Sequence, residues 1–284
     1  MIVITGATGH VGGELVAYLA YRGEKVRAIT RRPDAARFPD GVEAGYGDAA
    51  DPASLDVAFT GADRAFLMSA QPVGSAPAPS HVTALAQAAR RAGVEHAVLL
   101  SVLGGGTPGL ISEWHGQAEA SIVQSGMGWT LLRPGRFMSN ALAWAPSVAR
   151  GDEVSIPFLH RPAASIDPAD IAAIAALALT EPDRHHGARY ELSGPQALTP
   201  AQELAILADV LDRPLRPVEP PTDAVRAGMI RSGMPATLVD EIIAGFAADQ
   251  TRGTEVLPTV SQVLGRPART FAEWTTSHAR QFQR

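Results

Sequence analysis

Three glycines at three-residue spacing stand near the start of the chain. Gly6, Gly9 and Gly12 lie between an apolar run predicted to be a strand, residues 2–5, and a stretch predicted to be a helix, residues 11–21. Glycine permits unusual backbone angles and a close approach of the main chain to a pyrophosphate, and a helix N-terminus offers free N–H donors to an anion. The turn therefore predicts a dinucleotide site, with a tight turn that binds no ligand as the alternative.

The residues after the second predicted strand, residues 26–30, indicate which dinucleotide would bind. An acid about 20 residues beyond the glycines usually meets a free ribose 2′-hydroxyl, whereas a 2′-phosphate requires positive charge. This chain has Arg31 and Arg32 there, and guanidinium groups suit phosphate, so NADP(H) is favoured over NAD(H). A pair of solvated surface arginines is the alternative. Asp48, after the strand predicted at 42–45, is a candidate acceptor for the adenine amino group or a structural turn residue.

The elements that position these residues alternate along the first half of the chain. Short β-rich runs and helical patterns follow one another, which favours βαβ units and a parallel sheet. Between a capping Ser80 and a terminating Gly93, apolar residues at helical spacing mark one intervening helix, residues 80–92. We predict an α/β fold, a Rossmann-type doubly wound parallel sheet with a smaller, mostly helical C-terminal substrate lobe. The predicted strands are residues 2–5, 26–30, 42–45, 64–69, 95–102 and 129–133.

The pattern loosens after about Phe137, and the second half reads differently. Residues 151–162 predict irregular or short-stranded structure. Helices are predicted at residues 168–179, 200–211 and 238–247. The expected domains are an NAD(P)-binding domain over residues 1–150, with residues 163–182 packing back on it, and a smaller substrate lobe over residues 151–284.

Composition excludes several classes of function. The net charge is −5, the sequence pI is about 5.9 and the arginines are scattered, so the chain lacks the basic stripe that nucleic acid requires. No apolar run approaches the roughly 20 residues that span a membrane, and we expect a cytoplasmic protein. The absence of cysteine excludes disulfides, a thiolate nucleophile and cysteine-ligated metal, and no metal site is predicted. The expected partner is a small-molecule substrate, and the expected state is a monomer or a homodimer.

Several motifs together carry a resemblance to a known family. They are Gly6 to Gly12, Thr30 to Pro33, Leu100 to Gly104, Glu119, Ser125 to Asn140 and Ile166 to Ala172. In these stretches the chain resembles the NmrA-like branch of the atypical short-chain dehydrogenase/reductase superfamily. That branch includes NADPH-dependent quinone and dye reductases and redox-sensing regulators.

The fold and the resemblance together imply where the cofactor would lie. The glycine turn would meet the pyrophosphate, the residues after the fourth strand would follow the ribose, and two later segments would lie beside the nicotinamide. The predicted cofactor-binding residues are Gly6, Thr8, Gly9, His10, Val11, Gly12, Arg31, Arg32, Asp48, Ser69, Ala70, Gln71, Ser101, Val102, Leu103, Pro134, Gly135 and Phe137. By resemblance, residues 114–117 would lie near the reacting ring.

The chain departs from the superfamily at its catalytic motif. Short-chain dehydrogenases typically use Tyr-x-x-x-Lys, in which lysine lowers the tyrosine pKa for proton exchange. Lys25 is the only lysine here, and its formal partner Tyr21 precedes it at the amino edge of a strand, away from the edge where doubly wound sheets bind ligands. His115 and Gln117 stand where the motif would be. His115 is a candidate proton donor or a structural histidine, and Gln117 is a candidate hydrogen-bond donor.

A second set of residues follows the sixth predicted strand and could form a pocket wall for a flat substrate. Core packing is the alternative, and it is favoured for Met138 and Trp144. The predicted substrate contacts are Trp114, Phe137, Met138, Asn140 and Trp144. His185 and His186, in a charged loop without other candidate ligands nearby, are predicted to lie on the surface.

These observations favour one function over two alternatives. The first is an NADPH-dependent reductase that transfers hydride to a small conjugated or carbonyl substrate such as a quinone, without a Tyr-Lys pair; proximity and alignment alone contribute roughly 7–11 kcal/mol in well-oriented systems. The second is a regulatory protein that senses NADP(H) without turnover. The third is an isomerase or lyase that uses the cofactor transiently or structurally.

Overall fold

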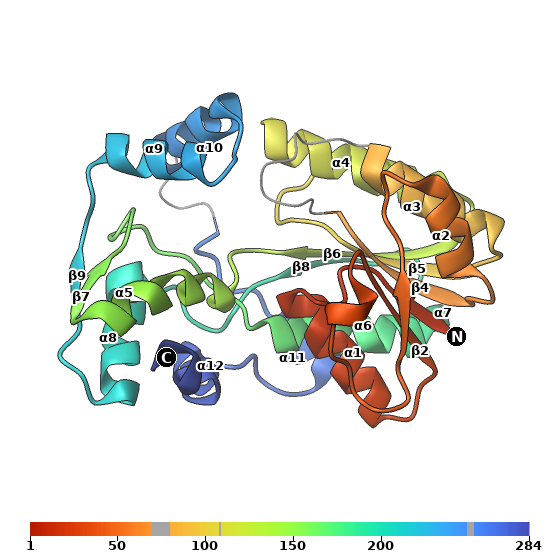
Figure 1. The fold of residues 1–284 in the computed structure, drawn as a ribbon, viewed down its shortest axis with the longest axis horizontal. Coiled ribbons are helices and arrows are strands. Elements are labelled where there is room, and N and C mark those ends of the chain that lie inside the picture. The colour runs from red at the N-terminus through yellow and green to blue at the C-terminus, as the bar shows by residue number, and fades with distance from the viewer. Residues whose placement is uncertain (70–79, 108, 249–252, 284) are drawn as a thin grey trace. The chain divides into compact units, whose positions relative to one another are not determined.

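A computed structural model of the protein describes residues 1–69, 80–107, 109–248 and 253–283. Its first compact unit is built on a parallel seven-stranded sheet (Figure 1). The strand order is β3-β2-β1-β4-β5-β6-β8. Because the order reverses at β1 and the paired strands are parallel, the sheet is doubly wound, which confirms the predicted Rossmann-type fold. The strands are β1 (Ile2–Ile4), β2 (Val26–Thr30), β3 (Glu43–Tyr46), β4 (Arg64–Met68), β5 (His96–Leu100), β6 (Gly128–Pro134) and β8 (Arg189–Leu192).

Helices cover both faces of this sheet (Figure 1). On one face α1 packs against α6, and on the other α3 lies between α2 and α4. Within the described ranges no helix is long and apolar enough to cross a membrane. The helices of this unit are α1 (His10–Tyr21), α2 (Pro52–Phe59), α3 (Ser80–Arg91), α4 (Leu110–Val123), α6 (Pro168–Thr180) and α7 (Pro182–His185), with a short 3₁₀ turn η1 (Pro33–Ala35).

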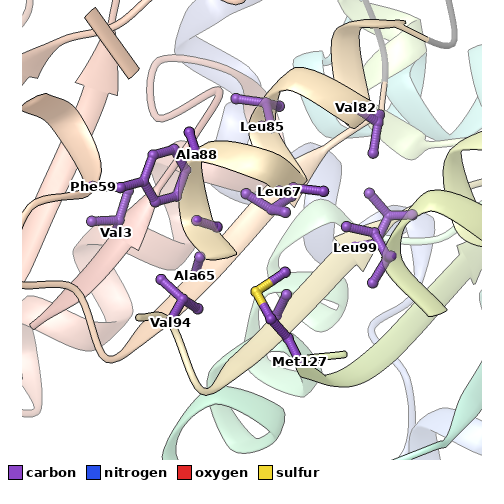
Figure 2. Close-up of a cluster of buried hydrophobic side chains, with 14 of the residues drawn as sticks. Val3, Phe59, Ala65, Leu67, Val82, Leu85, Ala88, Val94, Leu99 and Met127 are labelled. Carbon is purple, nitrogen blue, oxygen red and sulfur yellow. The ribbon is translucent and has the colours of Figure 1, made fainter. Parts of the chain in front are cut away.

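Apolar side chains fill the layer between the sheet and α2, α3 and α4. Val3, Leu67 and Leu99 point into it from three neighbouring strands, and Phe59 and Leu85 meet them from the helices (Figure 2). These strand positions share one face because side chains alternate along a strand. Burial of each such side chain contributes roughly 1.5–3 kcal/mol. The packing fixes the strand ends, and with them the loops that follow the strands.

The rest of the chain forms a second compact unit. It comprises residues 135–167, 192–248 and 253–283, and the first unit takes the other described residues. Its core gathers Leu207, Phe271 and Trp274, and Arg136 pairs with the fully buried Glu203. Its elements are η2 (Met138–Trp144), α5 (Ala145–Arg150), β7 (Glu153–Ser155), α8 (Pro200–Leu211), β9 (Arg216–Val218), α9 (Thr222–Arg231), α10 (Ala236–Ala248), α11 (Thr259–Leu264), α12 (Phe271–His278) and η3 (Ala279–Phe282). The domain boundary expected near residue 150 stays a prediction, because compactness does not test independent folding.

The prediction that both histidines of the 185–186 pair lie on the surface is wrong for the first of them. His186 is exposed, but His185 is buried and its Nδ1 lies 2.8 Å from the hydroxyl of Tyr190. Residues 182–185 form a helical turn, α7, and the strand that follows, β8, pairs with β6. This pairing places Tyr190 of β8 next to the ring of His185. The sequence pattern showed a charged loop and gave no sign of this edge strand.

A second buried histidine lies at the amino ends of β5 and β6. The Oγ1 of Thr130 donates to the carbonyl of His185 at 2.8 Å, so the Nε2 of His96, 3.1 Å away, must donate to Oγ1. Burial, with smaller contributions from His186, His185 and Arg64, lowers the pKa of His96 to about 4. His96 is therefore neutral in the folded protein at neutral pH.

We expect His96 to make the protein sensitive to acid. The unfolded chain takes up this proton below about pH 6.5 and the folded chain only below about pH 4, so stability is lost as the pH falls between these values. Between pH 7 and pH 5 the loss from this one group is about 2 kcal/mol. Denaturant unfolding of His96→Phe should show that much less loss over the same interval.

The exposed His160 provides the control for this measurement. His160→Gln should retain the pH dependence of the parent, because His160 is not among the groups that shift the pKa of His96. An unchanged loss of stability in His96→Phe would show that His96 is not the group that titrates.

Candidate functional site

The carboxyl ends of the parallel strands bring the predicted cofactor residues of the first unit to one edge of the sheet. Loops leave this edge after β3, β2, β1, β4 and β5, in that spatial order. They carry Asp48, Arg31, Gly6, Ser69 and Ser101 respectively. In open α/β sheets, ligands bind outside this edge where the strand order reverses, which here is at β1.

The glycine turn between β1 and α1 is formed by close backbone contacts. Gly6 has φ +63°, and its carbonyl accepts from the amide of Gly9 at 2.9 Å. A Cβ on Gly12 would lie 2.2 Å from the carbonyl oxygen of Gly6, so this position of α1 admits only glycine in the observed geometry. Gly9 is the N-cap of α1 and has no side chain to cap the first amides. Main-chain N–H groups at a helix N-terminus attract anions.

The turn is also anchored to the neighbouring strand. The hydroxyl of Thr5 donates to the carbonyl of Phe66 at 3.1 Å and accepts from the amide of Met68 at 3.0 Å. A Cβ on Gly6 would meet the Met68 side chain at 2.6 Å. The end of β4 thus packs against the glycine turn and holds it in place. Thr8, Gly9 and His10 are exposed on its open side, and Val11 is buried in the first turn of α1.

Two arginines and an aspartate follow the carboxyl ends of β2 and β3. Arg31 and Arg32 are exposed directly after β2. The half-buried Asp48 accepts from the amide of Ala50 at 3.0 Å, and its own amide donates to the hydroxyl of Ser54 at 3.0 Å, so its loop is held in a fixed turn. The arginines are thus solvated side chains on a rigid edge, as a phosphate site requires.

His81 lies at the same edge of the sheet, at the end of β4, and was not predicted from the sequence. It occupies the first turn of α3, and its ring hydrogen-bonds to the backbone of Met68. Burial lowers the pKa of His81, Asp48 and the Met68 bond oppose that shift, and Arg31 adds to it. The available signal was a histidine at the start of a helix that follows a strand of the sheet.

Ser69 and His115 form a buried pair at the ends of β4 and β5. The Oγ of Ser69 donates to the carbonyl of Leu100 at 2.5 Å and lies 2.8 Å from the Nδ1 of His115. A carbonyl cannot donate, so the hydroxyl proton is committed and Nδ1 must carry the proton of the imidazole. Burial lowers the pKa of His115 to about 4, against the opposing effect of Glu119. At neutral pH the ring is neutral, and Nε2 carries a lone pair rather than a proton.

A buried ion pair holds α4 against the sheet. Glu119 receives two hydrogen bonds from Arg133, at 2.9 and 2.5 Å, and one from the hydroxyl of Ser101 at 2.6 Å. The hydrogen bonds and charge of Glu119 raise the pKa of Arg133, so the guanidinium group stays protonated. Such a bidentate pair with its remaining lone pairs satisfied fixes geometry closely. Glu119 occupies the position one turn beyond His115, so the same bonds set the place of the histidine.

The loop after β5 packs closely on this helix. The amide of Leu103 donates to the carbonyl of Pro134 at 2.8 Å, and the amide of Gly105 donates to the carbonyl of Val102 at 3.0 Å. A Cβ on Gly116 would lie 2.6 Å from the Cα of Gly106, so backbone meets backbone there. The predicted nicotinamide-side residues of the first unit therefore belong to one rigid segment.

Other predicted residues have less defined places. Gln117 is exposed on α4, and Trp114 is half-buried with its ring 4.5 Å from that of His115. The indole Nε1 of Trp114 is buried and finds no acceptor within the described ranges. Ala70 and Gln71 lie outside the described residues. The roles of Trp114 and Gln117 stay predictions.

The predicted substrate contacts that follow β6 belong to the second unit. Phe137 is half-buried and bridges to Ile166, while Asn140 is exposed. Met138 and Trp144 are only 2% and 5% exposed and lie in the apolar core of that unit. Their burial agrees with the alternative considered above, in which they pack in the core. The amide of Gly135 donates to the carbonyl of Leu192 at 2.9 Å. Substrate contact by these residues stays a prediction.

The residues at the edge of the first unit fit a dinucleotide. The close contact between Gly12 and Gly6 and the glycine N-cap of α1 leave no side chain between the turn and a pyrophosphate. The described residues hold no group of three acidic or histidine side chains arranged for a metal ion. The donor set of this edge is one of amides and guanidinium groups, which suits phosphates.

We expect Gly12→Ala to weaken binding of NADPH at least tenfold. The new methyl would overlap the Gly6 carbonyl, and overpacking of this kind costs about 1–3 kcal/mol, enough to displace the turn. Isothermal titration of NADPH measures the effect. Gly13→Ala is the matched control, because its nearest neighbour would lie 3.7 Å away, and its affinity should equal that of the parent. Equal affinities in both variants would contradict the role of the turn.

Comparison with known proteins agrees with this geometry. The NAD(P)H-binding family matches residues 6–182. The chain is 39% identical to the (4-alkanoyl-5-oxo-2,5-dihydrofuran-3-yl)methyl phosphate reductase of Streptomyces griseus and 36% identical to the NAD(P)H azoreductase of Xenophilus azovorans, each over 99% of both chains.

A solved structure extends the likeness to the fold. The NADPH complex of the quinone oxidoreductase QOR2 from Escherichia coli superposes with a TM-score of 0.79 at 29% identity, over 98% of this chain and 99% of that one. The family match begins at Gly6 and covers the glycine turn, and the likeness to this oxidoreductase extends over both units of the chain. The chain therefore belongs to the NmrA-like branch of the atypical short-chain dehydrogenase/reductase superfamily and is an NAD(P)H-dependent oxidoreductase.

Proposed function

We propose that the protein is an NADPH-dependent reductase of small conjugated acceptors such as quinones. The observation that carries the cofactor choice is the pair of exposed guanidinium groups, Arg31 and Arg32, directly after β2. A ribose 2′-phosphate bears close to two negative charges, and guanidinium groups match it by charge and geometry. An acid at this place would instead favour the free hydroxyl of NADH.

The substrate class is supported by the relatives. Their names give a dihydrofuranone phosphate, azo compounds and quinones as substrates of those proteins. Such acceptors share a conjugated double bond that accepts hydride and stabilises the charge left behind by delocalisation. An enzyme for such substrates needs alignment more than a strong acid, which agrees with a chain whose only lysine, Lys25, lies at the amino end of β2.

The residues of the first unit would hold and orient the cofactor. When bound, reduced nicotinamide supplies the hydride. The α1 amides and the glycine turn would bind the pyrophosphate, and the Ser101 loop would support the nicotinamide half. Glu119 and Arg133 keep that loop and α4 in register, so the acceptor and the cofactor meet a rigid surface.

We assign His115 the role of hydrogen-bond acceptor rather than acid. Ser69 holds the proton of the ring on Nδ1, which leaves Nε2 with a lone pair. With a pKa of about 4, roughly one ring in a thousand is protonated at pH 7. The lone pair can fix an N–H or O–H group of cofactor or substrate, and the proton that completes reduction then comes from water.

We expect exchange of the two arginines to change the cofactor preference. Arg31→Asp with Arg32→Ala removes the charge complementary to the 2′-phosphate, so NADPH should bind at least tenfold more weakly while NADH changes less than twofold. Isothermal titration with both nucleotides gives the comparison. Arg22→Asp with Arg150→Ala, at two exposed arginines outside the predicted cofactor residues, makes the same change of −3 in net charge and is the control. Equal losses for NADPH and NADH would contradict the assignment.

We expect NADPH oxidation with quinones, and with azo dyes as a second acceptor class, to show turnover that varies little with pH. If His115 donated the proton, kcat would fall tenfold for each pH unit above its pKa of about 4. We expect less than a threefold change between pH 6 and pH 8. A tenfold fall per unit would make His115 the acid. Tight NADPH binding without turnover on any acceptor would instead support a regulatory role.

A further inference from the structure

Two histidines from distant parts of the chain meet at the amino edge of the sheet, opposite the edge that carries the glycine turn. His96 is the first residue of β5 and lies in register with Gly128, the first residue of β6. His186 directly follows α7. The centroids of the two imidazole rings lie 6.4 Å apart, with an angle of 60° between the ring planes. The sequence shows no second ligand near His186, but the fold brings one to it.

The Nδ1 atoms of both rings converge on the space beside Gly128. A Cβ on this glycine would lie 2.8 Å from Nδ1 of His96 and 3.3 Å from Nδ1 of His186. The same Cβ would lie 3.2 Å from the carbonyl oxygen of Glu95. Two imidazole nitrogens and one carbonyl oxygen therefore surround a single point, which is left open because β6 begins with a glycine.

The Nδ1 atom of His96 carries a lone pair. Nε2 of the same ring donates to Oγ1 of Thr130, which itself donates to the carbonyl of His185, so the ring proton lies on Nε2. Within the described ranges no hydrogen bond engages Nδ1, and this nitrogen is not one of the buried polar atoms that lack a partner, so it reaches solvent. A hydrogen bond that fixes one ring nitrogen and leaves the other as a lone pair is typical of metal-bound histidine.

The other histidine is free to adjust its ring. The side chain of His186 is exposed, while the amide of the next residue, Gly187, donates to the carbonyl of Trp129 at 2.8 Å and keeps this turn beside the start of β6. A Zn–N bond is about 2.0–2.1 Å long, so two imidazoles on one ion lie slightly closer together than these rings do. A rotation of the solvated His186 ring closes that difference without a shift of the backbone.

We propose that His96 and His186 form a binding site for a divalent transition-metal ion of the group Zn²⁺, Ni²⁺ and Cu²⁺. Imidazole nitrogen suits these ions, whereas Mg²⁺ and Ca²⁺ take oxygen ligands. The carbonyl oxygen of Glu95 and water would fill the remaining positions. The described residues offer no third histidine or acid to the ion, so we expect micromolar rather than nanomolar affinity.

The ion would act on the stability of the sheet edge. It would join the turn after α7 to the first residues of β5 and β6, next to the place where β8 pairs with β6. Because the carboxyl edge carries the proposed cofactor residues, this site at the amino edge does not depend on the proposed function. No covalent bond within the chain changes and no electron is transferred when the ion binds.

Trp129 provides a local reporter for the test. Its ring centroid lies 6.3 Å from that of His186, and Cu²⁺ quenches the fluorescence of indoles close to it. The full chain, without an affinity tag and freed of metal by a chelator, is titrated with Cu²⁺ at pH 7. For the parent we expect saturable quenching at micromolar Cu²⁺. Trp129→Phe should lose most of this signal and still bind Cu²⁺ by calorimetry, and Mg²⁺ should produce no quenching in the parent.

Three variants locate the ligands. His186→Gln removes an exposed imidazole and leaves the core intact, so it should weaken Cu²⁺ binding by about tenfold or more. Gly128→Ala keeps both histidines but places a methyl group at the point between the two nitrogens, and it should weaken binding to a similar extent. His160→Gln, at an exposed histidine of the second unit, should bind Cu²⁺ as the parent does.

A second measurement tests the effect on stability. Zn²⁺ should raise the urea midpoint of the parent but not that of His186→Gln, because an ion that binds only the folded chain stabilises it. Saturable quenching of equal strength in His186→Gln and the parent would place the ion elsewhere and refute the site. The absence of saturable quenching of the parent at millimolar Cu²⁺ would refute it as well.

Discussion

The contact between Gly12 and the carbonyl of Gly6 is the constraint on which the site depends. A single added methyl group at Gly12 would approach that oxygen to 2.2 Å, so α1 can start this close to β1 only where the helix presents no side chain. Gly9, the N-cap of α1, adds no side-chain hydrogen bond to the first amides of the helix. These amides form the pyrophosphate site that we propose.

Buried polar groups then fix the neighbouring part of the edge. A lone buried carboxylate would be costly, but Glu119 receives three hydrogen bonds from Arg133 and Ser101, which offset its desolvation. The commitment of the Ser69 proton to a carbonyl decides the tautomer of His115. Where short-chain dehydrogenases commonly have a tyrosine and a lysine one turn apart, this chain has a neutral imidazole and a paired carboxylate. The arrangement favours orientation of a reactive pair over proton delivery.

The sequence was sufficient for the features that depend on local pattern. Glycine spacing identified the turn at Gly6, and alternation of strands and helices identified the doubly wound sheet. Features that depend on tertiary contacts were missed: β8 is too short and polar to read as a strand, so the burial of His185 beneath Tyr190 was unforeseen. The approach of His81 to the glycine edge likewise required knowledge of how β2, β3 and β4 align. Local sequence patterns do not show which distant residues become neighbours in the fold.

A crystal structure of the protein grown with NADPH tests the central claim most directly. The expected result is a pyrophosphate within hydrogen-bonding distance of the first amides of α1, with the 2′-phosphate against the guanidinium group of Arg31. A nucleotide bound elsewhere on the chain, or a pyrophosphate that leaves those amides to solvent, would contradict the site that the Gly6–Gly12 contact builds.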